Sequence, residues 1–347
     1  MITCKPFGTL PTGEAVEAFT LSNSTDVSVE IITYGGIITR LLVPDADGKK
    51  ADIVLGLNGL DAYLAGHPYF GAITGRVAGR ITAGRFELDG EAYALALTNA
   101  PNHLHGGDVG FDKKLWTATP NDDADAPSLM LTYSSPDGEE GYPGTLDTTV
   151  CYRLNGAALE ISYEATTDRA TPVCLTNHSY FNLAGEGSGS VLDHIVQIKA
   201  DTIVPTDEDL TLQGRRVPVV APGTDFRTPC RLGDAVPHLL KHHGDNYCFR
   251  ETPIDAPEWV AQLSDPASGR VMDVFTNDTC MQFYTGKFLD GTLTGKSGKA
   301  YDTHAGLCME CQGYPDGVNT PEIDDIILRP GQTYKRQTEY RFCQKRL

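Results

Sequence analysis

The chain consists mainly of short segments in which apolar and polar side chains alternate. Residues 27–31 alternate in this way, and after the Gly35-Gly36 pair a second extended run continues from Ile37 to Val43. A period of two is typical of a β-strand with one buried face. The pattern therefore predicts two strands joined by a bend.

Two dipeptides mark tight turns between strand-like runs. Asp89-Gly90 lies between the runs 85–88 and 91–95, and Asn155-Gly156 lies within strand-like residues 148–165. Two-residue hairpin turns need positive φ angles, which Asp-Gly and Asn-Gly adopt readily. Both sites predict antiparallel hairpins.

Helical periodicity is nearly absent from the sequence. Only Leu60–Leu64 and Leu232–His243 predict short helices, while 36 glycines and 21 prolines interrupt the chain at short intervals. We find no internal repeat and no linker-like change in composition, so residues 1–347 are expected to form a single domain. The fold class predicted is all-β, a large antiparallel β-sandwich with a few short helices.

Composition narrows the function classes. Acidic residues outnumber basic ones by 46 to 28, which gives a net charge of −18 and disfavours binding to nucleic acid or to an anionic membrane surface. No run approaches the roughly 18 apolar residues of a membrane span, and the first residues do not resemble a secretory signal. We therefore expect a cytoplasmic protein whose ligand is neutral.

The cysteines do not indicate a disulfide framework or a metal site. Their number is odd, nine, and they are scattered from Cys4 to Cys343, so we interpret them as buried thiols. Cys308 and Cys311 form one Cys-x-x-Cys pair, but residues three apart on a strand point to opposite faces. No zinc site is expected there. His103 and His105 could form a separate metal-binding pair, but the sequence nominates no further ligands for it.

Polar residues in two apolar, strand-like segments could carry chemistry. Period two places His178, Tyr180 and Asn182 on one face, and it places Cys308, Glu310 and Gln312 on one face. A buried carboxylate must be paired or chemically employed. Glu310 is therefore either an ion-pair partner, with Arg80 as a candidate, or a catalytic group. The His242-His243 pair is expected on a solvated surface.

Several motifs, taken in chain order, carry a resemblance to a known family. They are Asn102-His103-Leu104-His105-Gly106-Gly107, Gly110-Phe111-Asp112-Lys113, Asn177-His178-Ser179-Tyr180-Phe181-Asn182-Leu183, Gln282-Phe283-Tyr284-Thr285-Gly286 and Glu310-x-Gln312-x-x-Pro315-Asp316. In this order they closely resemble the aldose 1-epimerase, or galactose mutarotase, family. The resemblance implies a large β-sandwich with a sugar-binding cleft, a free aldose such as galactose or glucose as substrate, and no cofactor or metal.

The resemblance also implies roles for individual residues. Glu310 is similar to the family's general base and His178 to its general acid, while His105 would assist the acid or hold the substrate. The residues expected to contact the sugar are Arg80, Gly79, Asp245, Gln282 and Tyr180. Many members of the family have Asn at the position of Gly79 and Trp at that of Tyr314, so the sugar preference stays open.

The chemistry explains why one acid and one base are needed. Opening a cyclic hemiacetal removes a proton from the anomeric hydroxyl and delivers one to the ring oxygen. We expect Glu310 to be ionised, and we expect its proximity to raise the pKa of His178.

Other functions stay open at this point. A hexose 6-phosphate epimerase would need more basic residues than Arg76 and Arg80, and a silent sugar-binding module would keep the fold without turnover. A glycosidase would need a second carboxylate across the bond from Glu310. The sequence does not decide between a monomer and a homodimer.

Overall fold

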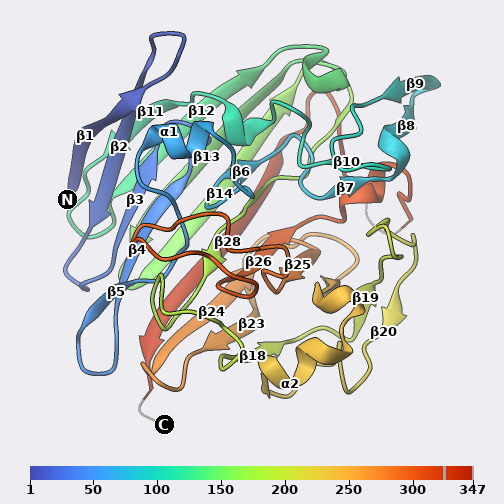
Figure 1. Ribbon diagram of the computed structural model, residues 1–347. Coiled ribbons are helices and arrows are strands. Elements are labelled where there is room, and N and C mark those ends of the chain that lie inside the picture. Colours follow the sequence, from blue (N-terminus) through green and yellow to red (C-terminus); the bar gives the residue numbers. More distant parts are fainter. Residues whose placement is uncertain (323–325, 346–347) are drawn as a thin grey trace.

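The computed structural model describes residues 1–322 and 326–345 and shows an all-β protein (Figure 1). Three large sheets, with five, nine and six strands, account for most of the paired residues. Every ladder between the named strands of the described chain is antiparallel, as the sequence predicts.

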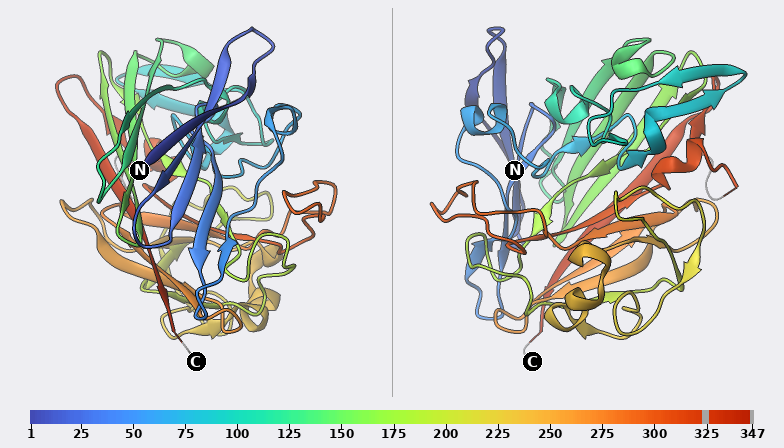
Figure 2. Two further views of the ribbon diagram at one scale, coloured as in Figure 1. Left: turned by 90° about the vertical axis from the view of Figure 1, so that its left-hand side faces the viewer. Right: turned by 45° about the vertical axis from the view of Figure 1, so that its right-hand side comes forward.

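The five-stranded sheet is formed by the N-terminal part of the chain and stands to one side of the other sheets (Figure 2). Its strands, in order, are β1 (Ile2–Thr9), β2 (Ala15–Ser22), β3 (Ser28–Ile32), β4 (Ile38–Pro44) and β5 (Lys50–Asp52). Strands β3 and β4 are the two strands predicted on either side of the Gly35-Gly36 bend, and they pair with each other antiparallel.

The nine-stranded sheet forms the long central layer of the molecule. Its strands, in order, are β11 (Thr117–Asn121), β12 (Ser128–Ser135), β13 (Leu146–Asn155), β14 (Ala158–Thr167), β28 (Tyr334–Gln344), β24 (Arg270–Thr276), β23 (Glu258–Ser264), β18 (Ile195–Ile198) and β21 (Cys230–Arg231). Strands β13 and β14 form the hairpin predicted from Asn155-Gly156.

The six-stranded sheet combines segments that are far apart in the sequence. Its strands, in order, are β17 (Tyr180–Phe181), β26 (Leu307–Gln312), β25 (Cys280–Tyr284), β22 (Asn246–Cys248), β19 (Thr202–Val204) and β20 (Val217–Pro218). Both faces of β26 are buried. Leu307, Met309 and Cys311 pack into the main apolar core, so the residues between them face the opposite side of the sheet.

Short ladders connect the large sheets. They are β6 (Ile73–Thr74) with β16 (Thr176–Asn177), β7 (Arg80–Ile81) with β10 (His103–Leu104), β8 (Arg85–Leu88) with β9 (Glu91–Ala94), and β15 (Thr171–Pro172) with β27 (Ile327–Leu328). The β8–β9 pair is the hairpin predicted from Asp89-Gly90.

The helices are as short as the sequence indicates. Helix α1 spans Leu60–Leu64, as predicted, whereas the predicted helix over Leu232–His243 breaks into α2 (Leu232–Ala235) and two single 3-10 turns. Pro237 and the left-handed φ of Lys241 (48°) interrupt the regular hydrogen bonding. Within the described residues, no helix has the length and apolar character that crossing a bilayer requires.

The cysteines are less uniformly buried than expected. Five of them are buried, but Cys4 is exposed and Cys151, Cys230 and Cys343 are partly exposed. Cys4 is on the N-terminal strand β1, whose side chains are mostly exposed. The expectation that every cysteine is buried therefore fails at this edge of the sheet.

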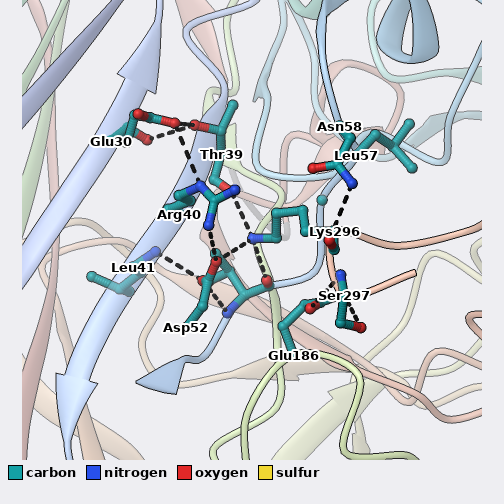
Figure 3. Close-up of polar contacts among 12 residues, drawn as sticks. Glu30, Thr39, Arg40, Leu41, Asp52, Leu57, Asn58, Glu186, Lys296 and Ser297 are labelled. Carbon is teal, nitrogen blue, oxygen red and sulfur yellow. Dashed lines mark hydrogen bonds and ion pairs between the residues drawn. The ribbon is translucent and has the colours of Figure 1, made fainter. Parts of the chain in front are cut away.

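A buried lysine ties the loop between β25 and β26 to the five-stranded sheet (Figure 3). The Lys296 ammonium lies 2.7 Å from the Asp52 carboxylate and donates hydrogen bonds to the carbonyl oxygens of Thr39 (2.6 Å) and Val54 (2.8 Å). The Lys296 side chain is only 3% exposed. Because all three donors of the ammonium find acceptors, the buried charge is fully compensated.

Candidate functional site

A cavity of about 350 Å³ lies on the face of the six-stranded sheet opposite the main core. Its lining brings together seven of the eight residues that the sequence nominates, namely Gly79, Arg80, His105, His178, Tyr180, Gln282 and Glu310. These residues come from five separate segments, so only the tertiary fold assembles them.

Strand register places the two proposed proton-transfer residues side by side. Tyr180 pairs with Cys308 across β17 and β26, which brings the preceding His178 next to Glu310. The distance from His178 Nε2 to Glu310 Oε2 is 3.5 Å, and the two side chains are 6% and 2% exposed. At this distance the two groups form a close pair but no hydrogen bond, and Glu310 Oε2 has no partner among the described residues, which leaves it free for a ligand.

Two tyrosine rings hold the His178 imidazole. The ring of Tyr180 lies 5.1 Å from it at an interplanar angle of 15°, and the ring of Tyr69 lies 5.7 Å away at 18°. Tyr69 adopts a left-handed φ of 61°, an unusual conformation for an aromatic residue that concentrates at functional sites. Sequence reasoning missed Tyr69, because neither its backbone conformation nor its stacking leaves a local signal.

The backbone fixes the protonation pattern of His105. Its Nδ1 accepts a hydrogen bond of 3.0 Å from the amide of Gly79, so the proton of the neutral ring is carried by Nε2. Burial lowers the pKa of His105 well below its usual value, and the nearby positive charge of Arg80 lowers it further. His105 is therefore a neutral hydrogen-bond donor. Gly79 itself has a φ of 77°, a region that Asn also tolerates, so Gly and Asn can both occupy this position.

The loop after His105 is packed too closely for any side chain. A Cβ atom on Gly106 would lie 1.8 Å from the carbonyl oxygen of Gly75. Gly106 also has a φ of 87°, which favours glycine. This contact holds the His105 segment against the 75–80 segment.

Burial sets the charge state of Glu310 and His178. It shifts the pKa of His178 in the opposite direction to the one that the sequence predicts. Burial raises the pKa of Glu310 to about 8, opposed by the positive charge of Arg80. Burial also lowers the pKa of His178 to about 3, so the predicted upward shift is wrong. Removing both groups from water outweighs their mutual attraction. At neutral pH the ligand-free pair holds one proton, which is on Glu310.

Arg80 is not the structural ion-pair partner of Glu310. Its Nε donates a 2.9 Å hydrogen bond to Asn99 Oδ1, and within the part of the chain that the structure describes it forms no ion pair. Arg76 points elsewhere: its guanidinium is buried and donates to Ser135 and to the carbonyl oxygen of Pro143. Of the described lining residues, Arg80 is the only lysine or arginine.

The far wall of the cavity carries amide side chains in register with Glu310. Asn246, Gln282 and Glu310 are directly opposed on β22, β25 and β26. Asn246 Nδ2 donates to Gln282 Oε1 at 3.0 Å. Asp245 is buried but is not among the lining residues, and burial raises its pKa to about 6. Sequence reasoning missed Asn246, although it directly follows the nominated Asp245.

The prediction for His243 is wrong. His242 is exposed as expected, but His243 is 6% exposed and lines the cavity, where it lies 4.9 Å from the ring of Tyr284 and 5.4 Å from that of Phe288. The following Gly244 packs against the backbone of Phe283 and turns this segment inward. Such a contact between distant segments is invisible in the sequence.

His105, His178 and Glu310 also form the kind of cluster that can hold a metal ion, because their ligand atoms lie within 4.8 Å of one another. The hydrogen bond from Gly79 argues against this use. With Nδ1 of His105 occupied as an acceptor, Nε2 bears the proton and has no lone pair for a metal. The donor set therefore suits a hydroxyl-bearing ligand better than a cation.

Comparison with known proteins shows the family to which the chain belongs. Residues 17–341 match the family model of aldose 1-epimerase. Galactose mutarotase from Rattus norvegicus is 46% identical over 346 residues, covering 98% of each chain. Aldose 1-epimerase from Escherichia coli (strain K12) is 34% identical, covering 96% of each. The crystal structure of galactose 1-epimerase from Lactobacillus acidophilus is 26% identical, covers 99% of both chains and superimposes with a TM-score of 0.85.

Proposed function

The chain belongs to the aldose 1-epimerase family, and from this premise we propose that His178 and Glu310 carry the proton transfers that interconvert the α and β anomers of a free aldohexose. The 3.5 Å contact between these two side chains is the observation that supports the assignment. The anomeric hydroxyl and the ring oxygen are bonded to the same carbon, so the groups that serve them must lie within a few ångströms of one another.

The reaction needs one proton in the pair at every stage. Glu310 accepts the proton of the anomeric hydroxyl as the bond between C1 and the ring oxygen breaks, and His178 delivers a proton to that oxygen. The open aldehyde rotates about its C1–C2 bond, and closure from the other face reverses both transfers. Atoms and charge balance without a redox partner.

Substrate binding moves the proton from Glu310 to His178 before the ring opens. A sugar hydroxyl that donates to Glu310 stabilises the carboxylate, and a ring oxygen that accepts from His178 stabilises the imidazolium. The two groups form a net-neutral pair in either arrangement, so no net charge enters the buried site. His105, as a fixed neutral donor, holds an adjacent oxygen.

A neutral sugar suits the cavity better than a phosphorylated one. Arg80 is the single guanidinium in the described lining, and it is already bonded to Asn99. Tight phosphate binding normally uses several converging cations. We therefore expect galactose or glucose to be turned over in preference to the corresponding 6-phosphate.

Optical rotation of freshly dissolved α-D-galactose and α-D-glucose tests the proposal. Positioned proton transfer is worth about 100- to 10,000-fold, so Glu310→Gln and His178→Asn should lower kcat by at least about 100-fold. Glu87→Gln and His238→Asn change exposed residues of the same types and should leave the rate unaltered.

Two results would contradict the assignment. Near-normal rates in Glu310→Gln or His178→Asn would remove these residues from the chemistry. Calorimetric sugar binding by the wild-type protein without faster anomer exchange would instead identify a binding module.

A further inference from the structure

The last residue of β26, Gln312, shares the cavity face of the sheet with Glu310. The two residues are separated by one position, and both line the cavity, whereas the intervening Cys311 packs into the main core. A strand rises about 3.4 Å per residue, so the two side chains start about 6.8 Å apart along the same wall. This separation is close to the span between the hydroxyl oxygens on C1 and C4, which lie at opposite ends of a pyranose.

The amide of Gln312 is buried and has no hydrogen-bond partner in the described part of the chain. The residue is 1% exposed, and neither Nε2 nor Oε1 accepts or donates a hydrogen bond within the described residues. Leaving a buried polar group unpaired costs about 1–3 kcal/mol, and native proteins rarely leave a whole amide in this state.

The other amides of the cavity wall are at least partly used. Asn99 accepts from Arg80, Asn246 donates to Gln282, and Gln282 donates in turn to the carbonyl oxygen of Phe283. Gln312 is thus the one amide of the described lining with both its donor and its acceptor free. No hydrogen bond within the described residues uses this amide.

We propose that Gln312 is a further substrate-binding residue, which recognises the hydroxyl at C3 or C4 of the sugar, on the side of the ring away from the anomeric carbon. This inference rests on the proposed function, since Glu310 fixes the position of C1. An amide donates and accepts at once, and a neutral hydroxyl does the same, so the pair can satisfy each other. A site built to bond a hydroxyl discriminates strongly against a sugar that lacks it.

Deoxy sugars provide the test. Gln312→Met preserves the length of the side chain and removes the amide, and polarimetry gives kcat/KM for galactose and its 2-deoxy, 3-deoxy and 4-deoxy forms. We expect Gln312→Met to lose at least about tenfold on galactose and on 2-deoxygalactose. On the 3-deoxy or the 4-deoxy sugar, the variant and the wild-type protein should differ by less than about twofold.

Stability offers a second readout. Because the variant removes an unpaired buried amide, its melting temperature without sugar should equal or exceed that of the wild-type protein. Gln312→Leu, which is shorter, repeats the test if the methionine variant does not fold. An equal loss on all four sugars, no loss on any of them, or a lower melting temperature would overturn the proposal.

The outcome is separable from that for the catalytic pair. Glu310→Gln should abolish turnover of all four sugars alike, whereas substitutions of Gln312 act selectively. If Glu310→Gln remains active, the proposed function fails whatever Gln312 does. If Glu310→Gln is inactive and Gln312→Met shows no selectivity, only the inference about Gln312 fails.

Discussion

Raising the pH should inactivate the enzyme, because the Glu310–His178 pair then loses its only proton. Burial holds the Glu310 pKa at about 8 and the His178 pKa at about 3. Between these values the pair has one proton, which is the form that the reaction requires. Above the Glu310 pKa neither residue can supply a proton to the ring oxygen, so kcat/KM should fall with rising pH.

The size of the fall follows from the pKa. With a value of about 8, about 90% of the molecules keep the proton at pH 7 and about 10% at pH 9. We therefore expect kcat/KM to decrease about tenfold across this range. Burial raises the pKa values of Tyr69, Tyr180 and Cys308 above their ordinary ranges, and the pKa of Asp245 is about 6. Glu310 is thus the cavity group that titrates in this window.

Polarimetry between pH 6.5 and 9.5, with the spontaneous rate subtracted at each pH, measures the profile. Arg80→Met should move the alkaline decrease to higher pH, since the Arg80 charge lowers the Glu310 pKa. A kcat/KM that stays constant or rises through pH 8 would refute the reasoning, because it would mean that the ionised Glu310 with a neutral His178 is the active form.

Three further predictions concern the supports of the site. Lys296→Met leaves Asp52, whose side chain is 14% exposed, with only a 4.0 Å ion pair to the partly exposed Arg40, and it should cost about 3 kcal/mol; for 347 residues, whose unfolding entropy is about 0.7 kcal/mol/K, the melting temperature should fall by about 4 °C. Lys50→Met is the matched control, since Lys50 and Asp26 are also 2.7 Å apart but 46% and 70% exposed, and it should lower the melting temperature by at most about 1 °C; equal effects would contradict the role of burial. Tyr69→Leu removes one of the two rings that stack on His178. It should lower kcat up to about tenfold and raise the His178 pKa measured by NMR, whereas Tyr69→Phe, which keeps the ring, should change neither. Gly106→Ala should lower the melting temperature far more than Gly90→Ala, because both positions have a positive φ (87° and 82°) but only the Cβ at Gly106 meets the Gly75 carbonyl; calorimetry showing similar losses would argue against this close contact.

The strands and tight turns were predictable because their signals are local. The pattern of apolar and polar residues marks strands β3 and β4. The dipeptides Asp89-Gly90 and Asn155-Gly156 mark the turns of the β8–β9 and β13–β14 hairpins. Helix α1 has the predicted bounds as well. In each case the side-chain pattern and the backbone requirement occur within the same few residues.

The site was only partly predictable, because its properties depend on contacts between distant segments. The motifs nominated His178 and Glu310, yet their pKa values shift in the direction that burial dictates rather than the direction of mutual attraction. His243 was expected on the surface, and the packing of Gly244 against Phe283 turns it inward. Tyr69 contributes through its conformation and stacking, neither of which a sequence displays.

Several buried polar atoms without a partner in the described chain gather on one wall of the cavity. Glu310 Oε2, both polar atoms of Gln312 and Asn246 Oδ1 are buried without a hydrogen-bond partner among the described residues. The buried ammonium of Lys296, in contrast, has an acceptor for each of its three protons. The same fold can therefore satisfy a buried charge completely. Unpaired groups that gather on one wall of a cavity lower stability, and a bound sugar, whose hydroxyls both donate and accept, recovers that cost.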